Sequence, residues 1–463
     1  MRTRNAAFIL TLVAGLLISA CQLMVVTPTQ EPTSGCRPMV VTPTQEPTPT
    51  EEIVKPTPDG TVVEGKIGEL KSDQSLITDA PIAAEDLKRL AEAENAFMLN
   101  LYEQVAEGDE NVIFSPYSLY QALLMAYVGA AGQTAQQMAA VLELPLEGEF
   151  NHLAMNGLDN WLTKSGAEAN DKPKFVFNSA NAVWGQYDYA FKQTYLDQLA
   201  MYYGAGLRAV DFGNSEEARV MINDWVADKT QNKIKDLIPQ GVLDEATRMV
   251  LTNAVYFKAA WMKQFEDLNT RPDSFYLLDG SSKQIDMMAI EENFSYYLGS
   301  DYTVIELPYD GGMSSMVVVM PKEGTLKDFE TRLDTEMLTT LTETLEHGKV
   351  QLSFPKFKFE SKLDLGQVLS ALGMSDAFDA NLADFSGMTS AKDLMISNVL
   401  QKALVEVDEK GTEAAAATAV IIGITSAPVE ADPQVIKIDH PFLFFIRDLE
   451  TNATLFMGRV IAP

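Results

Sequence analysis

Glu409-Lys410-Gly411-Thr412-Glu413-Ala414-Ala415-Ala416-Ala417-Thr418-Ala419-Val420 is a run of small side chains that carry little charge. Strand-like apolar sequence precedes this run, and a second apolar stretch, Asp439–Ile446, follows it downstream. A segment without bulky side chains is poorly suited to building a core, but an existing core can take it up without being overpacked.

A helix and a strand compete as the conformation of this run. Alanine is the best helix former, so Glu413–Ala417 alone favours a short surface helix. The run has no apolar face opposite a polar one, however, and the β-branched stretch Ile421–Ile424 follows it before Pro428. In a strand, alternate residues share a face, and one face would carry Thr412, Ala414, Ala416, Thr418 and Val420.

The segment resembles the reactive-loop hinge of the serpins, a family of serine protease inhibitors. Other motifs that resemble this family follow one another in its order along the chain. They are Asn111–Leu119, Gly129–Thr134, Ile222–Val226, Leu251–Lys258, Ala383–Met388, Asp439–Arg447 and Phe456–Val460. The resemblance covers residues 85 to 463 and implies a serpin domain over that range.

Periodicity predicts an α+β protein, with helices first and strands later. Helices are expected at 84–107, from the Ser115-Pro116 turn to Gly129, and at 362–373. Strands are expected at 174–184, 249–257, 303–308, 315–320, 349–359, 400–408, 434–438, 442–446 and 453–460. The family resemblance refines this prediction to three β-sheets, eight or nine helices and an exposed reactive-centre loop.

The resemblance also implies a mechanism, in which the loop is bait for a protease and inserts into the largest sheet after cleavage. The residues that match the hinge and inserting segment are Glu409, Gly411, Thr412, Glu413, Ala414, Ala415, Ala416, Ala417 and Thr418. A bulky or charged side chain on the inserting face would slow insertion, and Thr412, Ala414, Ala416 and Thr418 are all small. The hinge sequence therefore favours an active inhibitor.

The family's distance from hinge to cleavage site places the reactive bond between Thr425 and Ser426. The loop downstream is slightly long for the family, so Ile424–Thr425 is the alternative bond. Thr or Ile before the bond suits a small or aliphatic specificity pocket, as in elastase-like or subtilisin-like proteases. No Lys or Arg lies between Lys410 and Lys437, which disfavours trypsin-like targets.

Five residues match positions that control sheet opening in the family, namely Ser115, Ser118, Asn253, Trp261 and Gln401. In most proteins, residues of these types would simply be a helix cap, satisfied buried amides and a core tryptophan. Gln401 departs from the family, which commonly has His there, and Gln does not titrate near neutral pH.

Composition excludes several classes of function. The chain of 463 residues has 65 acidic and 35 basic residues, a formal charge of −30, so it should repel nucleic acid. It shows no Lys/Arg cluster that would bind a polyanion. Its three His residues leave little material for a metal site or a His-based triad, and no Gly-x-Ser-x-Gly or Walker pattern occurs. We therefore expect no enzyme activity, no metal and no cofactor; His440 is interpreted as structural.

The N-terminus reads as an export signal. Arg2 and Arg4 precede an apolar stretch that ends at Ala20-Cys21, which resembles a bacterial lipoprotein cleavage box. Residues 1–20 are predicted to be the signal peptide and Cys21 the lipidation site. The alternative is an ordinary secretory signal that leaves a free thiol on Cys21.

A tandem repeat follows the signal. Residues 21–35 and 36–50 are identical at eleven of fifteen positions, so Cys36 is interpreted as a copy of Cys21. The stretch is rich in Pro and Thr, which favours extended, solvated chain. Residues 21–84 are predicted to be a disordered tether, and the only membrane contact would be through the N-terminal lipid.

The predicted protein is thus a monomeric suicide inhibitor of serine endopeptidases outside the cytoplasm, either anchored to a bacterial envelope or secreted. Two alternatives stay open: a non-inhibitory serpin-fold carrier, chaperone or binding protein, and a cross-class inhibitor of cysteine proteases. The first alternative is disfavoured because the hinge lacks the charged, Pro-containing or bulky residues typical of non-inhibitory relatives.

Overall fold

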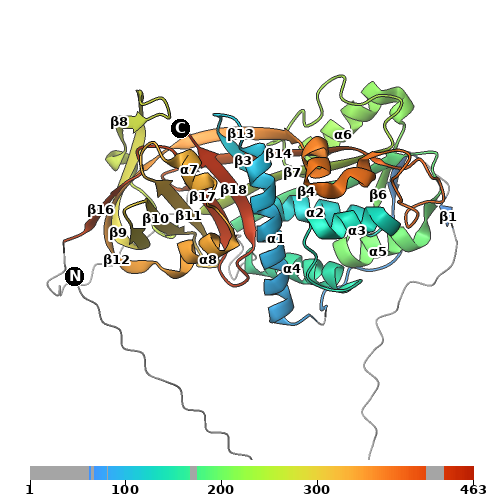
Figure 1. Ribbon diagram of the computed structural model, residues 1–463, viewed down its shortest axis with the longest axis horizontal. Helices are drawn as coiled ribbons and strands as arrows, with labels where there is room; N and C mark the ends of the chain where they lie inside the picture. Colours follow the sequence, from blue (N-terminus) through green and yellow to red (C-terminus); the bar gives the residue numbers. More distant parts are fainter. Residues whose placement is uncertain (1–61, 64–66, 81, 167–174, 413–431) are drawn as a thin grey trace, which may run out of the picture. The chain divides into compact units, whose positions relative to one another are not determined.

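The computed structural model describes residues 62–63, 67–80, 82–166, 175–412 and 432–463. These residues form the expected α+β fold. The described part of the chain contains nine α-helices (Figure 1): α1 (Ala84–Val105), α2 (Pro116–Tyr127), α3 (Gly132–Val141), α4 (Phe150–Gly166), α5 (Gln193–Tyr203), α6 (Ser215–Lys229), α7 (Leu326–Glu330), α8 (Thr335–Glu343) and α9 (Gly366–Leu369).

The strands of the described residues form three sheets. The seven-stranded sheet, hereafter the main sheet, has the order β13 (Phe357–Asp364), β14 (Ile396–Asp408), β15 (Gly411–Thr412), β7 (Met249–Ala260), β4 (Phe175–Gln186), β6 (Leu207–Val210), β2 (Gly68–Leu70). The nine-stranded sheet has the order β16 (Gln434–Lys437), β12 (Glu346–Pro355), β9 (Ser282–Leu298), β10 (Tyr302–Pro308), β11 (Ser314–Pro321), β17 (Phe442–Asp448), β18 (Thr454–Val460), β3 (Val112–Phe114), and β8 (Arg271–Tyr276) also pairs with β9. A two-stranded ladder joins β1 (Val62–Val63) to β5 (Phe191–Lys192). These counts agree with the expected three sheets and eight or nine helices.

Helix α2 lies between the main sheet and the nine-stranded sheet. Ser115 caps its N-terminus by accepting a hydrogen bond from the backbone N–H of Ser118, and Pro116 begins its first turn. Its side chains are almost all buried and belong to the large core that also contains the fully buried strands β11 and β18. Helix α2 therefore forms a packed layer under the main sheet.

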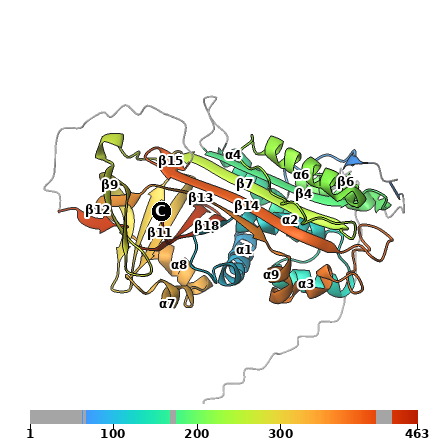
Figure 2. The ribbon, with the colours of Figure 1, turned by 90° about the horizontal axis from the view of Figure 1, so that it is seen from above.

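Helix α6 covers the opposite face of the main sheet. Figure 2 shows β14 and β7 as long neighbouring strands, with α6 alongside β7 and β4. A second, smaller core joins Ile222 and Val226 of α6 to Ala254 of β7 and Leu400 of β14. β14 and β7 are thus covered by a helix on each face of the sheet, α6 on one and α2 on the other.

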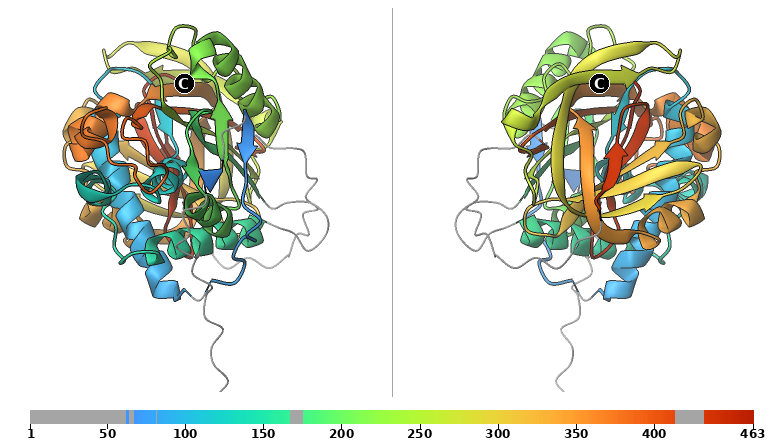
Figure 3. Two further views of the ribbon diagram at one scale, coloured as in Figure 1. Left: turned by 90° about the vertical axis from the view of Figure 1, so that its right-hand side faces the viewer. Right: turned by 90° about the vertical axis from the view of Figure 1, so that its left-hand side faces the viewer.

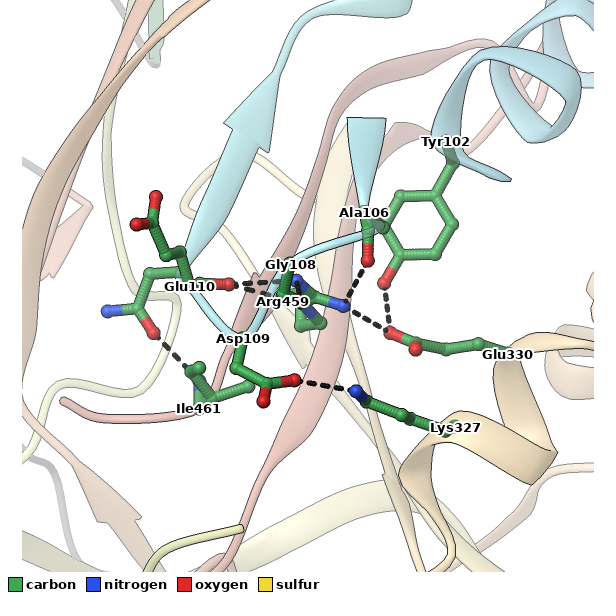
Figure 4. Close-up of polar contacts among 10 residues, drawn as sticks. Tyr102, Ala106, Gly108, Asp109, Glu110, Lys327, Glu330, Arg459 and Ile461 are labelled. Carbon is green, nitrogen blue, oxygen red and sulfur yellow. Dashed lines mark hydrogen bonds and ion pairs between the residues drawn. The ribbon is translucent and has the colours of Figure 1, made fainter. Parts of the chain in front are cut away.

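The C-terminal strand is anchored by a buried arginine. The guanidinium of Arg459, in β18, donates hydrogen bonds to the carbonyl oxygens of Ala106 at 2.8 Å and Gly108 at 2.7 Å (Figure 4). It also pairs with Glu330 of α7, which accepts a further bond from the Tyr102 hydroxyl. These contacts satisfy the carbonyls at the end of α1, where cations are favoured, and tie α1 and α7 to the last strand.

Two expected boundaries were wrong. The predicted tether reached residue 84, but Gly68–Leu70 forms the edge strand β2 of the main sheet. The helix expected at 362–373 begins only at Gly366, because residues 357–364 form β13 along β14. In β13 Phe357, Phe359 and Leu363 alternate with more exposed residues, a strand period that extends past the expected start of the helix.

Candidate functional site

The candidate site is the seam between β14 and β7 at the centre of the main sheet. These strands are parallel and pair directly from Ile396–Met249 up to Leu404–Tyr256. Beyond that point β15 lies between them and is antiparallel to both, with Thr412 opposite Val407 on one side and Ala259 on the other. The hinge residues Gly411 and Thr412 therefore already form a short strand at one end of the seam.

The turn from β14 into β15 is fixed by an aspartate and a glycine. The Asp408 carboxylate accepts hydrogen bonds from the backbone N–H groups of Lys410 at 2.8 Å and Gly411 at 3.2 Å. A Cβ atom on Gly411 would lie 2.0 Å from the carbonyl oxygen of Ala259, so only glycine permits this approach. Local sterics therefore explain why the residue that matches the family's hinge glycine is a glycine.

Thr412 is held by an aromatic pair. Its side chain is buried, and its Oγ1 lies 2.7 Å from the hydroxyl of Tyr309. The Tyr309 ring stacks on Trp261, with ring centroids 4.7 Å apart and planes 7° apart. Trp261 in turn donates from Nε1 to the carbonyl oxygen of Asp408 at 3.0 Å. The structure thus places Trp261 where the hinge enters the sheet, while its control of opening stays a prediction.

Glu409 anchors the chain just before the hinge. Its carboxylate accepts hydrogen bonds from Lys356 Nζ at 2.8 Å and from Thr270 Oγ1 at 2.7 Å. Burial alone would raise the pKa of Glu409, but these hydrogen bonds lower it below its ordinary value. Glu409 is therefore ionised at neutral pH and pins this end of β14 to the segment between β12 and β13.

A second polar cluster lies midway along the seam and contains four of the predicted control residues. Gln401 of β14 donates from Nε2 to Asn253 Oδ1 at 2.6 Å, directly across the seam from β7. The same amide group exchanges two hydrogen bonds with the backbone of Ser115, at 2.9 and 3.0 Å. Asn253 donates from Nδ2 to Ser118 Oγ at 2.6 Å. The cluster joins β14, β7 and the start of α2.

Sequence reasoning missed the other half of this cluster. Asn181 of β4 accepts hydrogen bonds from Asn253 Nδ2 and Ser118 Oγ, and donates to Gln121 Oε1 at 2.7 Å. Ser179 lies 2.5 Å from Ser118, oxygen to oxygen. The available signal was the polar run Asn178-Ser179-Ala180-Asn181 inside an expected strand.

The hinge-end residues and the polar cluster lie at different points along the seam. Trp261, Glu409, Gly411 and Thr412 lie at the hinge end. Gln401 lies six residues before Val407, the β14 partner of Thr412, a separation of about 20 Å at ~3.3 Å per strand residue. An opening that starts at the hinge would therefore have to propagate to the Gln401–Asn253 bond.

The remaining predicted residues lie outside the described part of the chain. They are Glu413, Ala414, Ala415, Ala416, Ala417, Thr418, the reactive-bond residues Thr425 and Ser426, and Cys21. Within the described ranges, no set of three or more His, Cys, Asp or Glu side chains could hold a metal ion. Nor is any helix there long and apolar enough to cross a membrane.

His440 lies away from the seam. Its Nδ1 is 2.9 Å from the Asp439 carboxylate and its Nε2 is 2.8 Å from the carbonyl oxygen of Pro321. Burial lowers the pKa of this imidazole, but the hydrogen bonds to Asp439 and Pro321 outweigh it and raise the pKa above the ordinary value. The ring bridges the loop before β17 to the end of β11.

Sequence comparison identifies the class of protein to which this fold and seam belong. Residues 92–463 match the family described as Serpin (serine protease inhibitor). The chain belongs to the serpin family, whose members are generally protease inhibitors that bind target proteases, rather than enzymes.

Individual relatives agree with this assignment. The chain is 38% identical over 377 residues to an uncharacterized serpin-like protein of Thermococcus kodakarensis, covering 81% of this chain and 86% of that protein. It is 39% identical to serpin B6 of Macaca fascicularis, covering 81% and 99% respectively. The crystal structure of the thermophilic serpin tengpin in the native state superposes with a TM-score of 0.75 at 28% identity, covering 87% of this chain and all of that one.

Proposed function

We propose that this protein is a suicide inhibitor of serine endopeptidases, which traps the acyl-enzyme by inserting its cleaved loop between β14 and β7. The observation that carries the proposal is the position of β15. Gly411 and Thr412 already occupy the first positions of an inserted strand, paired to both neighbours. The rest of the seam is a parallel pair, which is slightly less stable per residue than the antiparallel pairs an inserted strand would form.

The register of β15 sets the length of loop that the seam can take. Thr412 lies opposite Val407 and Ala259, and each further loop residue would pair one residue earlier on both strands. β14 begins eleven positions before Val407 and β7 ten positions before Ala259, so an inserted loop would reach residues 422–423. A cleavage site at Thr425–Ser426, or at Ile424–Thr425, fits this length.

The same register explains the small side chains. Residues 414, 416 and 418 would share the face of Thr412, which is the buried face under the sheet. Ala414 would arrive between Val405 and Phe257, and Ala416 between Ala403 and Val255, all of them buried. There is no room for a large side chain at these positions without overpacking.

Thr418 would arrive between Gln401 and Asn253. Insertion must break the Gln401–Asn253 hydrogen bond, which would leave two buried amide groups without a partner. A threonine hydroxyl both donates and accepts, so it can replace that bond from either side. This supports a role for Thr418 in stabilising the inserted strand.

The proposed reaction breaks one peptide bond and forms one ester bond. The protease serine attacks the carbonyl carbon of Thr425, the Thr425–Ser426 bond breaks, and Ser426 leaves with a new α-amino group. Thr425 is then joined to the protease by an ester. Insertion of ten or so residues would add ladder hydrogen bonds worth on the order of 10 kcal/mol in total, comparable with the stability of a whole domain. Strand addition on this scale can drag the protease before water hydrolyses the ester.

Incubation with elastase, subtilisin, trypsin and papain, followed by denaturing electrophoresis and mass mapping, tests this proposal. A covalent complex with elastase or subtilisin, and a released peptide that begins at Ser426, is the expected result. Complexes with papain alone would assign a cysteine protease as target. Clean cleavage by all four enzymes, without any complex, would sink the inhibitory mechanism.

We further propose that the inhibitor acts outside the cytoplasm, on a lipid anchor at Cys21. The support is the signal-like stretch before Cys21 and the Pro/Thr-rich repeat after it. Labelling of expressing bacteria with a clickable fatty acid should mark the wild type and the Cys36→Ser variant but leave Cys21→Ser unlabelled. Equal labelling of the two variants, or no labelling of the wild type, would reject the anchor.

A further inference from the structure

A pocket of about 640 Å³, hereafter the end pocket, lies at the end of the seam away from the hinge. Residues 395–398 at the start of β14 and residues 246–247 just before β7 line it from the two sides of the seam. Gln367 of α9 and Ser370 of the helical turn after it form part of the remaining wall. The left view of Figure 3 looks at the molecule from this end, with the orange helical segment that contains α9 and the light-green helix α6 on opposite sides. The end pocket is therefore built around the ends of the two strands between which the loop would insert.

Hydrogen bonds fix the walls of the end pocket. The Thr247 hydroxyl is buried and donates to the Asp244 carboxylate at 3.1 Å, and the same carboxylate accepts from the backbone N–H of Ala246 at 2.9 Å. Across the seam, the backbone N–H of Arg248 donates to Ser397 Oγ at 2.9 Å. The ends of the two strands are thus held in place around the pocket, which is not a gap left by frayed chain.

The register of the inserted strand brings the last residues before the reactive bond to the end pocket. Thr412 lies opposite Ala259 of β7, and each further loop residue would pair one residue earlier on that strand. Ile424 follows Thr412 by twelve residues, so it would lie opposite Thr247, which precedes Ala259 by twelve. Thr425, whose carbonyl carbon the protease attacks, would follow one position further along the lining of the pocket.

The loop sequence also changes character toward this end. Residues 414–419 are all alanine or threonine, whereas three of the four residues 421–424 are isoleucine. Val242, Phe378 and Met395 give the end pocket an apolar lining. An isoleucine side chain gains free energy by leaving water for such a surface, and in a pocket it meets open space instead of a filled core. A bulky residue is therefore suited to the end of the loop, where it would be harmful near the hinge.

We propose that the end pocket binds Ile424 after cleavage and so fixes the end of the inserted loop that carries the protease. The inference rests on the proposed function, in which Thr425 is joined to the protease serine by an ester. One residue spans at most about 3.6 Å, so an ester one residue beyond a fixed Ile424 has almost no slack. The protease is then held against the end of the main sheet, and the loop cannot slip back out of the seam.

A disulfide tests the position of Ile424. Ile424→Cys is combined with Thr247→Cys in the full chain, with both native cysteines changed to serine, and the loop is cut at Thr425–Ser426 by a protease that is not trapped. Opposite residues of paired strands come close enough to form a disulfide, so we expect at least about tenfold more cross-link in cut than in intact protein, quantified by mass spectrometry after mild oxidation. The matched control is Ile424→Cys with Gln240→Cys, an exposed position in the same loop outside the pocket lining, which should stay unlinked in both forms.

The unfolding midpoint of the same samples reports insertion itself. A higher midpoint after cutting, together with the cross-link, is the expected result. A higher midpoint without the cross-link would show that insertion stops short of the end pocket, which overturns this inference and leaves the inhibitory function standing. An unchanged midpoint would overturn both. If the protein with Thr247→Cys does not fold, Met395→Cys on the β14 side of the pocket takes its place.

Filling the end pocket should impair trapping. Ala246→Trp adds bulk to the lining and keeps the hydrogen bond that the backbone N–H donates to Asp244. Glu245→Trp is the matched control, because it adds the same side chain at the neighbouring exposed residue, outside the lining. We expect the ratio of cleaved inhibitor to covalent complex to rise at least about threefold for Ala246→Trp and to stay at the wild-type value for Glu245→Trp. An unchanged ratio in both variants, or an equal rise in both, would overturn the role of the end pocket in trapping.

Discussion

Thr412 is the second residue of β15, at the hinge end of the seam. Its side chain is 1% exposed and bonded to Tyr309, so any replacement is already felt before cleavage. We expect Thr412→Arg to slow insertion, because burying an unpaired guanidinium is very unfavourable. The ratio of cleaved inhibitor to covalent complex, read from gel titrations with the target protease, should rise by about tenfold or more.

Thr412→Ser is the control for this prediction, since it keeps the hydroxyl that faces Tyr309 and adds no bulk. It should inhibit like the wild type. An unchanged partition for Thr412→Arg would mean that this position is not buried during trapping.

Gln401 gives a prediction about pH. A histidine at this position would gain a proton below its ordinary pKa of about 6.5 and would then lack an acceptor for the Ser115 N–H. We expect Gln401→His to retain inhibition but to convert to latent or polymeric forms at a rate that changes between pH 6 and 8. Native gels of both proteins across this range measure it. A conversion rate that stays the same between pH 6 and 8 in the histidine variant would contradict the prediction.

The sequence could place most of this polar cluster because its members sit in motifs. Ser115, Ser118 and Asn253 each belong to a family pattern, and Gln401 was found as a departure from one. Asn181 and Gln121 lie outside the motifs matched in the sequence, and a lone amide inside a strand does not reveal which side chains it will face. Their partners depend on the register of β4 with β7, which only the fold supplies.

At the scale of elements, helix α4 packs through a buried histidine. His152 Nδ1 lies 2.6 Å from the Tyr203 hydroxyl, and its ring stacks on Tyr202 at 5.4 Å, both in α5. Burial lowers the pKa of His152 to about 4, from an ordinary value of 6.5. The folded protein thus holds this imidazole neutral, while the unfolded chain takes up a proton below about pH 6.5.

Stability should therefore fall as the pH drops from about 6.5 to about 4, by roughly 3 kcal/mol from this group. His152→Gln cannot titrate, so the difference in unfolding free energy between wild type and variant should shift by that amount over this range, measured by urea unfolding. His347→Gln provides a matched control substitution at an exposed histidine, away from the contacts with Tyr202 and Tyr203. Parallel curves for wild type and His152→Gln would contradict the assignment.

Element boundaries were harder to predict than element types. The helix α1 and the strands β7, β11, β14 and β18 follow clear periodic patterns. The segment 67–80 does not, because a three-residue strand such as Gly68–Leu70 carries too little pattern to be read. Its order comes from the partner strand β6 and from α5, which are more than a hundred residues away in the sequence.

At the scale of the whole molecule, the main sheet has a parallel seam at its centre. Two parallel neighbours, β14 and β7, are joined across their centre by the Gln401–Asn253 bond and are separated at one end by β15. The layers on both faces, α2 beneath and α6 above, close the seam without filling it with another strand. The family motifs implied such a sheet, but they did not indicate that the hinge already enters it.

If the seam accepts the loop as proposed, the protein should gain stability when the loop is cut. Nicking the loop with a protease that cleaves it without being trapped frees the upstream strand to insert. At on the order of 10 kcal/mol of added ladder bonding, the unfolding midpoint should rise by about 20 °C, measured by calorimetry on intact and nicked protein. Thr412→Arg, nicked at the same bond, should gain far less, because the buried site of Thr412 does not suit a guanidinium and the hinge would leave the sheet before the rest of the loop could follow. Equal midpoints for intact and nicked wild type would show that the seam does not accept the loop, and the native sheet would then be the final one.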